Sequence, residues 1–405
     1  MSKIRIQNVG PVKDGYLAND GWMDISDVTV FIGNQGSGKS TVAKLISTMT
    51  WMEKALVRGD FGNKEISETL FKRHIGYQNI ENYLSDNSVI EYEGSAYIIS
   101  YNKGVINVSK NELNGYSFPK IMYVPSERNF LSSVRNVRNL KGLPSTLYTF
   151  SDEFSDALEN LKGPLKLPIN NTRFEYQKRN LSSYISGEDY KVNLMQASSG
   201  FQSFVPLFIV SNYLANSLNS KSDSGTSDIS IDQSRRIRKE IEELYANPNI
   251  SDEIRKVSLE VLSKGFKYSS FINIVEEPEQ NLFPTSQQHL LNSLIGFKNM
   301  QEDNKLILTT HSPYIVNYLS IAIQAGSLLK RNLPNALLSK LNSVVPMGST
   351  LAAEEVSVYQ FDELKGRITD LPDFEGIPSD TNFLNLSLAA GNNAFDTLLE
   401  IEQEL

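Results

Sequence analysis

The sequence predicts an α/β fold built on a parallel core sheet. Three apolar runs of strand length, residues 28–32, 271–275 and 305–309, are each followed by sequence with helical spacing. Strands that alternate with helices favour a parallel sheet, because each helix returns the chain to the start of the next strand. A fourth apolar run, residues 121–124, is typical of the same sheet.

The length, net charge and cysteine content of the chain disfavour several classes of protein. The chain has 405 residues, 40% of them hydrophobic, and a net charge of -8. It is long enough for two or three lobes, and its acidity disfavours a protein that coats nucleic acid or anionic membrane. There is no cysteine, which excludes disulfides and thiolate chemistry and favours the cytoplasm. No run of 18 apolar residues occurs, so we expect no membrane partner.

The N-terminal third predicts a strand, a helix and an antiparallel sublobe. Residues 4–9 alternate as in a strand, and from Ser40 the apolar residues follow helical spacing. Three short β-patterned runs then follow one another, at residues 88–92, 96–101 and 105–108. We expect them to form an antiparallel meander.

The rest of the sequence, after the N-terminal third, predicts an insertion in the main domain and a C-terminal lobe. Residues 1–330 are expected to form the main domain, with a mostly helical insertion at about 140–265. Within that insertion we expect a polar loop at 216–232 and helices at 234–245 and 251–263. Residues 331–405 read as a small appended lobe that ends in an amphipathic helix, 394–405. That helix either docks on its own core or contacts a partner.

A phosphate-binding loop follows the strand 28–32. Its sequence satisfies G-x-x-x-x-G-K-[ST], with an apolar strand before it and an amphipathic helix after it. Backbone N–H groups of such a loop face phosphate oxygens, the lysine reaches the β- and γ-phosphates, and the Ser40 hydroxyl can hold Mg²⁺. The predicted ATP-binding residues are Gly33, Asn34, Gln35, Gly36, Ser37, Gly38, Lys39, Ser40 and Thr41.

Two carboxylates follow the strand 271–275. Alone, Glu276 and Glu277 would be read as a solvated strand end. After a phosphate-binding loop, however, a carboxylate at this point is expected in the Mg²⁺ shell, and the next one can polarise the attacking water. We therefore predict Glu276 as a metal residue and Glu277 as catalytic.

A second anion site is predicted at the start of the helix 201–214. Ser198, Ser199 and Gly200 offer hydroxyls and free N–H groups there. The alternative is a capped core helix with no ligand.

Four segments resemble motifs of the ABC/SMC/RecF-type ATPases, most closely the OLD-like branch. Residues 197–202 (A-S-S-G-F-Q) resemble the L-S-G-G-Q signature, and residues 276–284 resemble the E-E-P-E-x-x-L-[HF]-P segment. Residues 309–313 (T-T-H-S-P) and 123–128 (Y-V-P-S-E-R) match two further motifs, and the resemblance covers about residues 1–330. Glu276 replaces the usual Asp and Ala197 the usual Leu.

This resemblance implies an ABC-type P-loop head that uses ATP and Mg²⁺. Ser198, Ser199, Gly200 and Gln202 of one protomer would close on ATP bound by Lys39 of another, in a homodimer or higher oligomer. His311 would sense the γ-phosphate and is predicted as catalytic. Glu127 and Arg128 are either a structural ion pair or part of a coupling loop.

Three functional classes remain. They are a transporter subunit, a RecF-type DNA-maintenance ATPase, and an OLD-like ATPase of bacterial antiphage systems such as PARIS or Septu. The motif forms favour the last, in which the ATPase controls a separate effector, often a nuclease. No D-x-D pattern follows His311, so we expect no intrinsic nuclease. Two basic clusters are either solvated helix faces or a surface for nucleic acid: Arg128, Arg135, Arg138 and Lys141, and Arg235, Arg236, Arg238 and Lys239.

Overall fold

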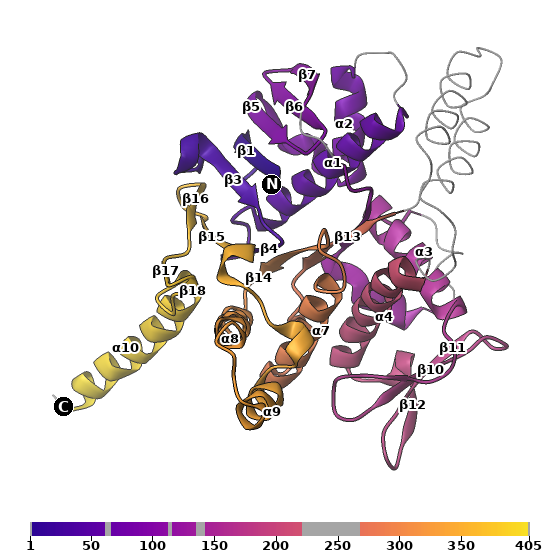
Figure 1. Cartoon of the computed structure of the whole chain (residues 1–405). Coiled ribbons are helices and arrows are strands. Elements are labelled where there is room, and N and C mark those ends of the chain that lie inside the picture. Colours follow the sequence, from indigo (N-terminus) through magenta and orange to yellow (C-terminus); the bar gives the residue numbers. More distant parts are fainter. Residues whose placement is uncertain (1, 61–65, 112–115, 135–141, 221–267, 404–405) are drawn as a thin grey trace.

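The computed structural model describes residues 2–60, 66–111, 116–134, 142–220 and 268–403. Its centre is a seven-stranded sheet in the order β2-β16-β15-β4-β14-β13-β8 (Figure 1). Adjacent parallel strands form most of this sheet: β15 (Val356–Asp362), β4 (Val28–Gly33), β14 (Lys305–Thr310), β13 (Ser270–Glu276) and β8 (Pro119–Val124). β16 (Arg367–Asp370) is antiparallel to β15, and β2 (Gly15–Tyr16) closes the edge. The predicted α/β class with a parallel core is confirmed.

The two faces of the central sheet are covered by different layers, because alternate residues of a strand point to opposite sides. Phe31 and Ile307 pack in one core with α1 (Lys39–Arg58) and the N-terminal sheet. Val30 and Leu308 pack in a second core on the other face. The helices of that face are α3 (Ser145–Glu159), α4 (Ser199–Ser220), α7 (Pro284–Lys298) and α8 (Pro313–Leu329).

The N-terminal sheet is a five-stranded antiparallel layer over α1. Its order is β3 (Trp22–Ile25), β1 (Ser2–Val9), β5 (Leu84–Glu93), β6 (Tyr97–Asn102) and β7 (Val105–Lys110). The expected meander corresponds to β5, β6 and β7, and is confirmed. The helix α2 (Glu68–Tyr77) lies beside this layer (Figure 1).

The insertion differs from the expectation of mostly helical sequence. A four-stranded antiparallel sheet lies between α3 and α4, made of β9 (Leu165–Lys166), β10 (Arg173–Gln177), β11 (Ser182–Ser186) and β12 (Lys191–Asn193). These strands are too short for a clear alternation in sequence, but Phe174 and Ile185 pair across them and both are fully buried. α4 continues through Asn216 to Ser220, where a loop was expected. The rest of that loop, the helices expected at 234–245 and 251–263, and most of both basic clusters lie outside the described residues.

The expected boundary at residue 330 does not separate a lobe from the core. β15 pairs with β4 in the central sheet, with Val358 opposite Val30. The expectation of a separate lobe is therefore wrong. It failed because pairing between strands so far apart in sequence leaves no local pattern in the sequence. Shorter elements of the same region are α9 (Asn335–Val344), β17 (Asp373–Phe374) and β18 (Ile377–Pro378).

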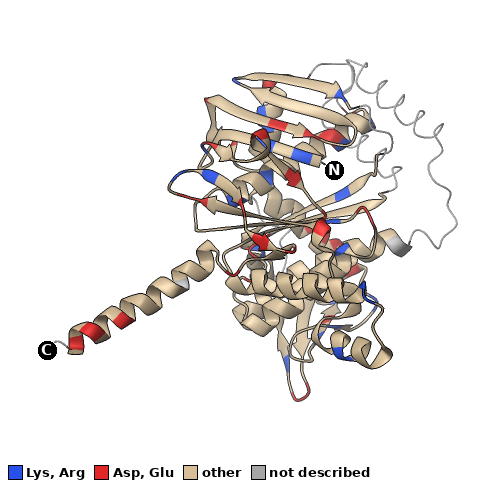
Figure 2. Ribbon diagram, turned by 60° about the vertical axis from the view of Figure 1, so that its left-hand side comes forward, with Lys and Arg blue, Asp and Glu red and all other residues tan. Residues whose placement is uncertain are grey.

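The chain ends in a longer helix than predicted. α10 (Phe383–Gln403) projects away from the body, with the C-terminus at its far end (Figure 2). Phe395, Leu398, Leu399 and Ile401 are exposed, so this part of the helix does not dock on its own core. Over the described ranges, no helix combines the length and apolarity needed to cross a membrane.

Candidate functional site

The phosphate-binding loop connects β4 to α1. Gly38 precedes the helix with a φ of 105°, and a Cβ there would lie 2.8 Å from a Val12 methyl group. A Cβ on Gly33 would lie 2.7 Å from the Phe361 carbonyl oxygen. Both positions therefore require glycine. No side chain caps α1, which leaves its first N–H groups for another acceptor, such as a phosphate.

Lys39 lies inside this loop. Its ammonium donates to the carbonyl oxygens of Gly33 at 2.9 Å and Asn34 at 2.7 Å, and its side chain is buried. Burial lowers the pKa of Lys39 to about 8, although Glu277 and Glu279 oppose the shift. A phosphate anion is a stronger partner for an ammonium than a carbonyl, so Lys39 is poised to exchange these bonds for a ligand.

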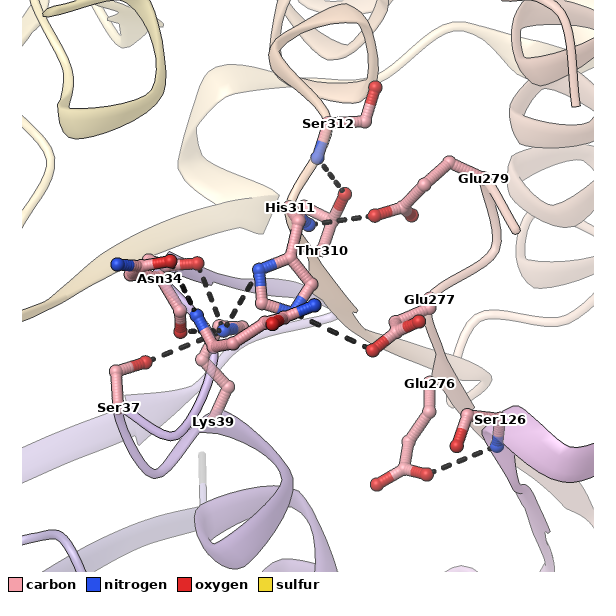
Figure 3. Close-up of polar contacts among 12 residues, drawn as sticks. Asn34, Ser37, Lys39, Ser126, Glu276, Glu277, Glu279, Thr310, His311 and Ser312 are labelled. Carbon is pink, nitrogen blue, oxygen red and sulfur yellow. Dashed lines mark hydrogen bonds and ion pairs between the residues drawn. The ribbon is translucent and has the colours of Figure 1, made fainter. Parts of the chain in front are cut away.

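His311 lies between Lys39 and Glu277 (Figure 3). Its Nδ1 is 3.5 Å from the Lys39 Nζ, and its Nε2 is 3.5 Å from the Glu277 Oε1. The hydrogen bond with His311 is the main cause that lowers the pKa of Glu277. In the tautomer with the proton on Nε2, Nδ1 accepts from the ammonium and Nε2 donates to the carboxylate. The ends of β4, β13 and β14 thus bring three predicted residues together.

The carboxylate of Glu276 points elsewhere and has two partners of its own. Its oxygens accept hydrogen bonds from the Tyr123 hydroxyl at 2.5 Å and from the Ser126 N–H at 3.1 Å. Figure 3 shows this side chain directed away from His311.

The predicted Mg²⁺ ligands fit that ion in their chemistry. The Ser40 hydroxyl and the Glu276 carboxylate are the hard oxygen donors that Mg²⁺ prefers. Within the described ranges, no cluster of three or more His, Asp or Glu residues could hold a metal by itself. Such a site would depend on phosphate oxygens for its remaining ligands, as is usual for Mg²⁺.

Arg128 connects the acidic strand end to α4. Its guanidinium donates to the carbonyl oxygens of Glu276 at 2.7 Å, Glu277 at 2.6 Å and Ser203 at 3.2 Å. The side chain is fully buried, and burial lowers its pKa to about 10. Its hydrogen bonds thus go to carbonyl groups rather than to Glu127, and Arg128 braces the backbone that carries Glu277.

Glu279 also belongs to the site, although no role was predicted for it. Its carboxylate accepts a 2.7 Å hydrogen bond from the backbone N–H of His311, which ties the turn after β14 to the turn after β13. Burial is the main cause that raises the pKa of Glu279. The only sequence feature that could have indicated a role for Glu279 is its position in the E-E-P-E segment, residues 276–279.

The signature segment lies apart from the loop of its own chain. Ser198 and Ser199 are exposed, and in the described structure no hydrogen bond joins residues 197–202 to the loop 33–40. The Gln202 side chain instead donates to the carbonyl oxygens of Leu194 and Met195, at 3.3 and 3.0 Å. The structure therefore brings Lys39, Glu277 and His311 together but does not bring the signature residues to them.

A cavity of about 700 Å³ opens beside the loop, and the C-terminal region forms part of its wall. Asn34 and His311 line it together with Glu363 and Phe383. The Asn34 amide also donates to the Glu363 carboxylate at 3.0 Å. This contribution of Glu363 was not predicted from the sequence, because residue 363 was expected in a separate lobe.

The chain is similar to known ATPases. The family model of the AAA ATPase domain matches residues 254–316, a stretch that includes Glu276, Glu277 and His311. No curated protein matches the chain by sequence. The family match and the loop geometry support an ATPase of the P-loop class.

Solved structures show only a distant likeness. The SMC head domain from Thermotoga maritima is 11% identical, covers 92% of this chain and 98% of its own, and has a TM-score of 0.36. An Smc head domain bound to the C-terminal domain of ScpA, derived from Pyrococcus furiosus, is 9% identical and covers 99% and 100%, with a TM-score of 0.36. A nucleotide-free ATP-binding cassette from an ABC transporter is 12% identical and covers 93% and 94%, with a TM-score of 0.30. The functional conclusion rests on the residues of the site.

Proposed function

We propose that the protein binds and hydrolyses ATP with Mg²⁺, as an ABC-type ATPase. The observation that carries this proposal is the contact of His311 with both Lys39 and Glu277 beside a glycine loop that leaves helix N–H groups open. Lys39 would bind the phosphates, and Glu277 would orient the attacking water. His311 would report the γ-phosphate to Glu277. Mg²⁺ would supply charge neutralisation of the phosphates, with Ser40 and Glu276 in its shell.

The ATP site would be completed by a second copy of the chain. Ser198 and Ser199 are exposed, and in the described structure they form no hydrogen bond with the phosphate-binding loop of their own chain. Both observations support their action on nucleotide bound by another protomer. ATP would then hold two protomers together, and hydrolysis would release them. Gln202 would have to leave its carbonyl partners to join such a site.

The output of this switch would be control of a separate effector protein in the cytoplasm, with a nuclease as one candidate. The resemblance of the motifs to the OLD-like ATPases supports a role in antiphage defence. A RecF-type role in DNA maintenance is the alternative, and nucleic acid would then be the partner.

Mixing two inactive variants tests the composite site. Lys39→Ala and Ser198→Arg chains should each be inactive, whereas a mixed dimer contains one site with Lys39 and Ser198 both intact. The mixture should regain ATPase activity, up to about half per mixed dimer if the sites act independently. Sedimentation of Glu277→Gln with and without ATP is the companion measurement, since ATP should tighten association by linkage. Full activity from a strict monomer would refute the composite site.

A further inference from the structure

A second cavity, of about 340 Å³, lies between α1, α2, α3 and β8. Its volume falls within the range of about 300–1,000 Å³ that is typical of small-molecule sites. Trp51, Lys54, Gln78, Lys120, Tyr123 and Tyr268 are among its lining residues. None of the predicted ATP-binding residues lines it, so this cavity is separate from the phosphate-binding loop.

Lys54 supplies an uncompensated positive charge in this cavity. Its side chain is only 6% exposed, and its ammonium donates one hydrogen bond, to the Pro119 carbonyl oxygen at 3.3 Å. It also lies over the Tyr268 ring, 5.3 Å from the centroid. An ammonium has three donors, and in the described structure no carboxylate forms an ion pair with Lys54. A buried charge left in this state is costly unless a ligand compensates it.

The neighbouring charges are already paired with one another. Lys120 forms an ion pair with Glu153, and Arg58 forms one with Asp60. When Lys54 is protonated, the cavity wall therefore carries a positive charge that no ion pair offsets, which suits an anion.

Gln78 adds an unsatisfied acceptor. Its amide nitrogen donates to the Ser47 hydroxyl at 3.2 Å, while its side-chain oxygen is buried without a hydrogen-bond partner. A buried acceptor of this kind is unfavourable until a donor reaches it. Two aromatic side chains also line the cavity, Trp51 and Tyr268, and the ammonium groups of Lys54 and Lys120 lie over the Tyr268 ring.

We propose that this cavity binds a small molecule that carries an anionic group on a planar ring. The anion contacts the ammonium group of Lys54, the ring packs against Trp51, and an N–H or O–H of the ligand donates to the side-chain oxygen of Gln78. Cation, aromatic and acceptor groups that converge on one cavity are the composition expected of such a site.

The protonation of Lys54 is consistent with anion binding. Its pKa is lowered to about 7, mainly by burial and also by the nearby charges of Arg58 and Lys120, while Asp60 and Glu153 oppose the shift. His74, also in the wall, is neutral at pH 7 because burial lowers its pKa to about 4. The charged form of Lys54 binds the anion, so affinity should fall as the pH rises through 7.

The cavity is connected to the ATP site through Tyr123. The ring of Tyr123 lines the cavity, and its hydroxyl donates to the Glu276 carboxylate. A ligand that shifts this ring would change the position of the Glu276 carboxylate. An effect on ATP turnover rests on the proposed ATPase function, whereas binding of the ligand to the cavity does not.

Tryptophan fluorescence tests the binding directly. The chain has two tryptophans, so Trp22→Phe leaves Trp51 as the only reporter. Phenyl phosphate is the probe. Inorganic phosphate and phenol, which each carry one of its two groups, are the comparison ligands. Phenyl phosphate should change Trp51 emission saturably at millimolar concentration, and more strongly than either half. Lys54→Met should weaken its binding by about tenfold or more. Lys72→Met, on the exposed face of α2, is the matched control and should leave the affinity unchanged.

Thermal unfolding separates a ligand site from a merely structural lysine. If Lys54 serves a ligand, Lys54→Met removes an uncompensated buried charge and should raise the Tm of the ligand-free protein. A structural lysine would give the opposite shift. The proposal is overturned if phenyl phosphate fails to bind at millimolar concentration, if Lys54→Met binds it as well as Lys72→Met does, or if Lys54→Met lowers the Tm. Neither measurement uses ATP turnover, so failure here leaves the ATPase proposal standing, and loss of ATPase activity leaves this one standing.

Discussion

The backbone N–H of His311 donates a 2.7 Å hydrogen bond to the carboxylate of Glu279. This bond holds the turn after β14 against the turn after β13, and His311 contacts Lys39 and Glu277 from that position. The orientation of the imidazole therefore depends on a residue that itself need not contact the nucleotide.

Glu279→Gln should raise stability at neutral pH by a few degrees in Tm. Glu279 has a raised pKa in the folded state, so the native protein binds more protons than the unfolded chain at pH values between the unfolded and folded pKa. Stability is consequently lost as the pH rises through the folded pKa, and glutamine removes this loss. Melts at pH 7 and pH 4 provide the measurement, and an equal gain at both would contradict the assignment. Glu279→Leu, which cannot accept the His311 bond, should lower kcat.

Arg128→Met should destabilise the fold by about 3 kcal/mol or more. The substitution leaves the carbonyl oxygens of Glu276 and Glu277 buried without their donor. Urea unfolding gives the value, and Arg331→Met at an exposed position is the control. A loss below about 1 kcal/mol would mean that water or another group satisfies these carbonyls.

Lys39→Ala should weaken ATP binding by about a hundredfold or more in a protein that remains folded, because it removes the charge that faces the phosphates. Lys44→Ala on the same helix is the control. Calorimetry should also show wild-type affinity falling as the pH rises through about 8, where the empty site's Lys39 loses its proton. Wild-type affinity in Lys39→Ala would disprove the loop assignment.

Glu277→Gln should bind ATP with nearly unchanged affinity and turn it over about a hundredfold more slowly. The amide keeps the shape of the carboxylate but cannot polarise water. Steady-state turnover and nucleotide binding are measured on the same preparation. Turnover within about tenfold of wild type would mean that another group positions the water.

The purified protein should not cleave DNA or RNA with Mg²⁺ or Mn²⁺, since no D-x-D pattern follows His311. Gel assays on labelled substrates give the measurement. Cleavage that persists through purification and is lost when Asp370 and Asp373 are changed to Ala would contradict this prediction.

Local patterns made much of the fold predictable. The loop 33–40 and the apolar strands before and after it are contiguous in sequence, so their periodicity and glycine spacing suffice. Glu277 and His311 each directly follow a buried strand, but their predicted roles depended on the preceding phosphate-binding loop and on the resemblance of the motifs, because a carboxylate or a histidine at a strand end is common. Their mutual distance was not predictable from spacing, because it depends on the order in which β4, β14 and β13 lie in the sheet.

Contacts between residues far apart in the sequence were not predicted. Val358 pairs with Val30, and Glu363 accepts a hydrogen bond from Asn34, yet nothing near residue 360 signals either partner. Arg128 is a second example. Its side chain was expected either in an ion pair with Glu127 or in a coupling loop, but it binds carbonyl oxygens, which all sequences share.

The place of β4 in the sheet has a consequence for synthesis on the ribosome. This strand is synthesised before both of its neighbours, β14 (Lys305–Thr310) and β15 (Val356–Asp362). The loop that follows β4 therefore cannot be fixed in its final sheet until residue 362 has left the exit tunnel. Premature termination before residue 356 would leave one edge of β4 open to pairing with other chains, so truncated products should aggregate rather than bind nucleotide.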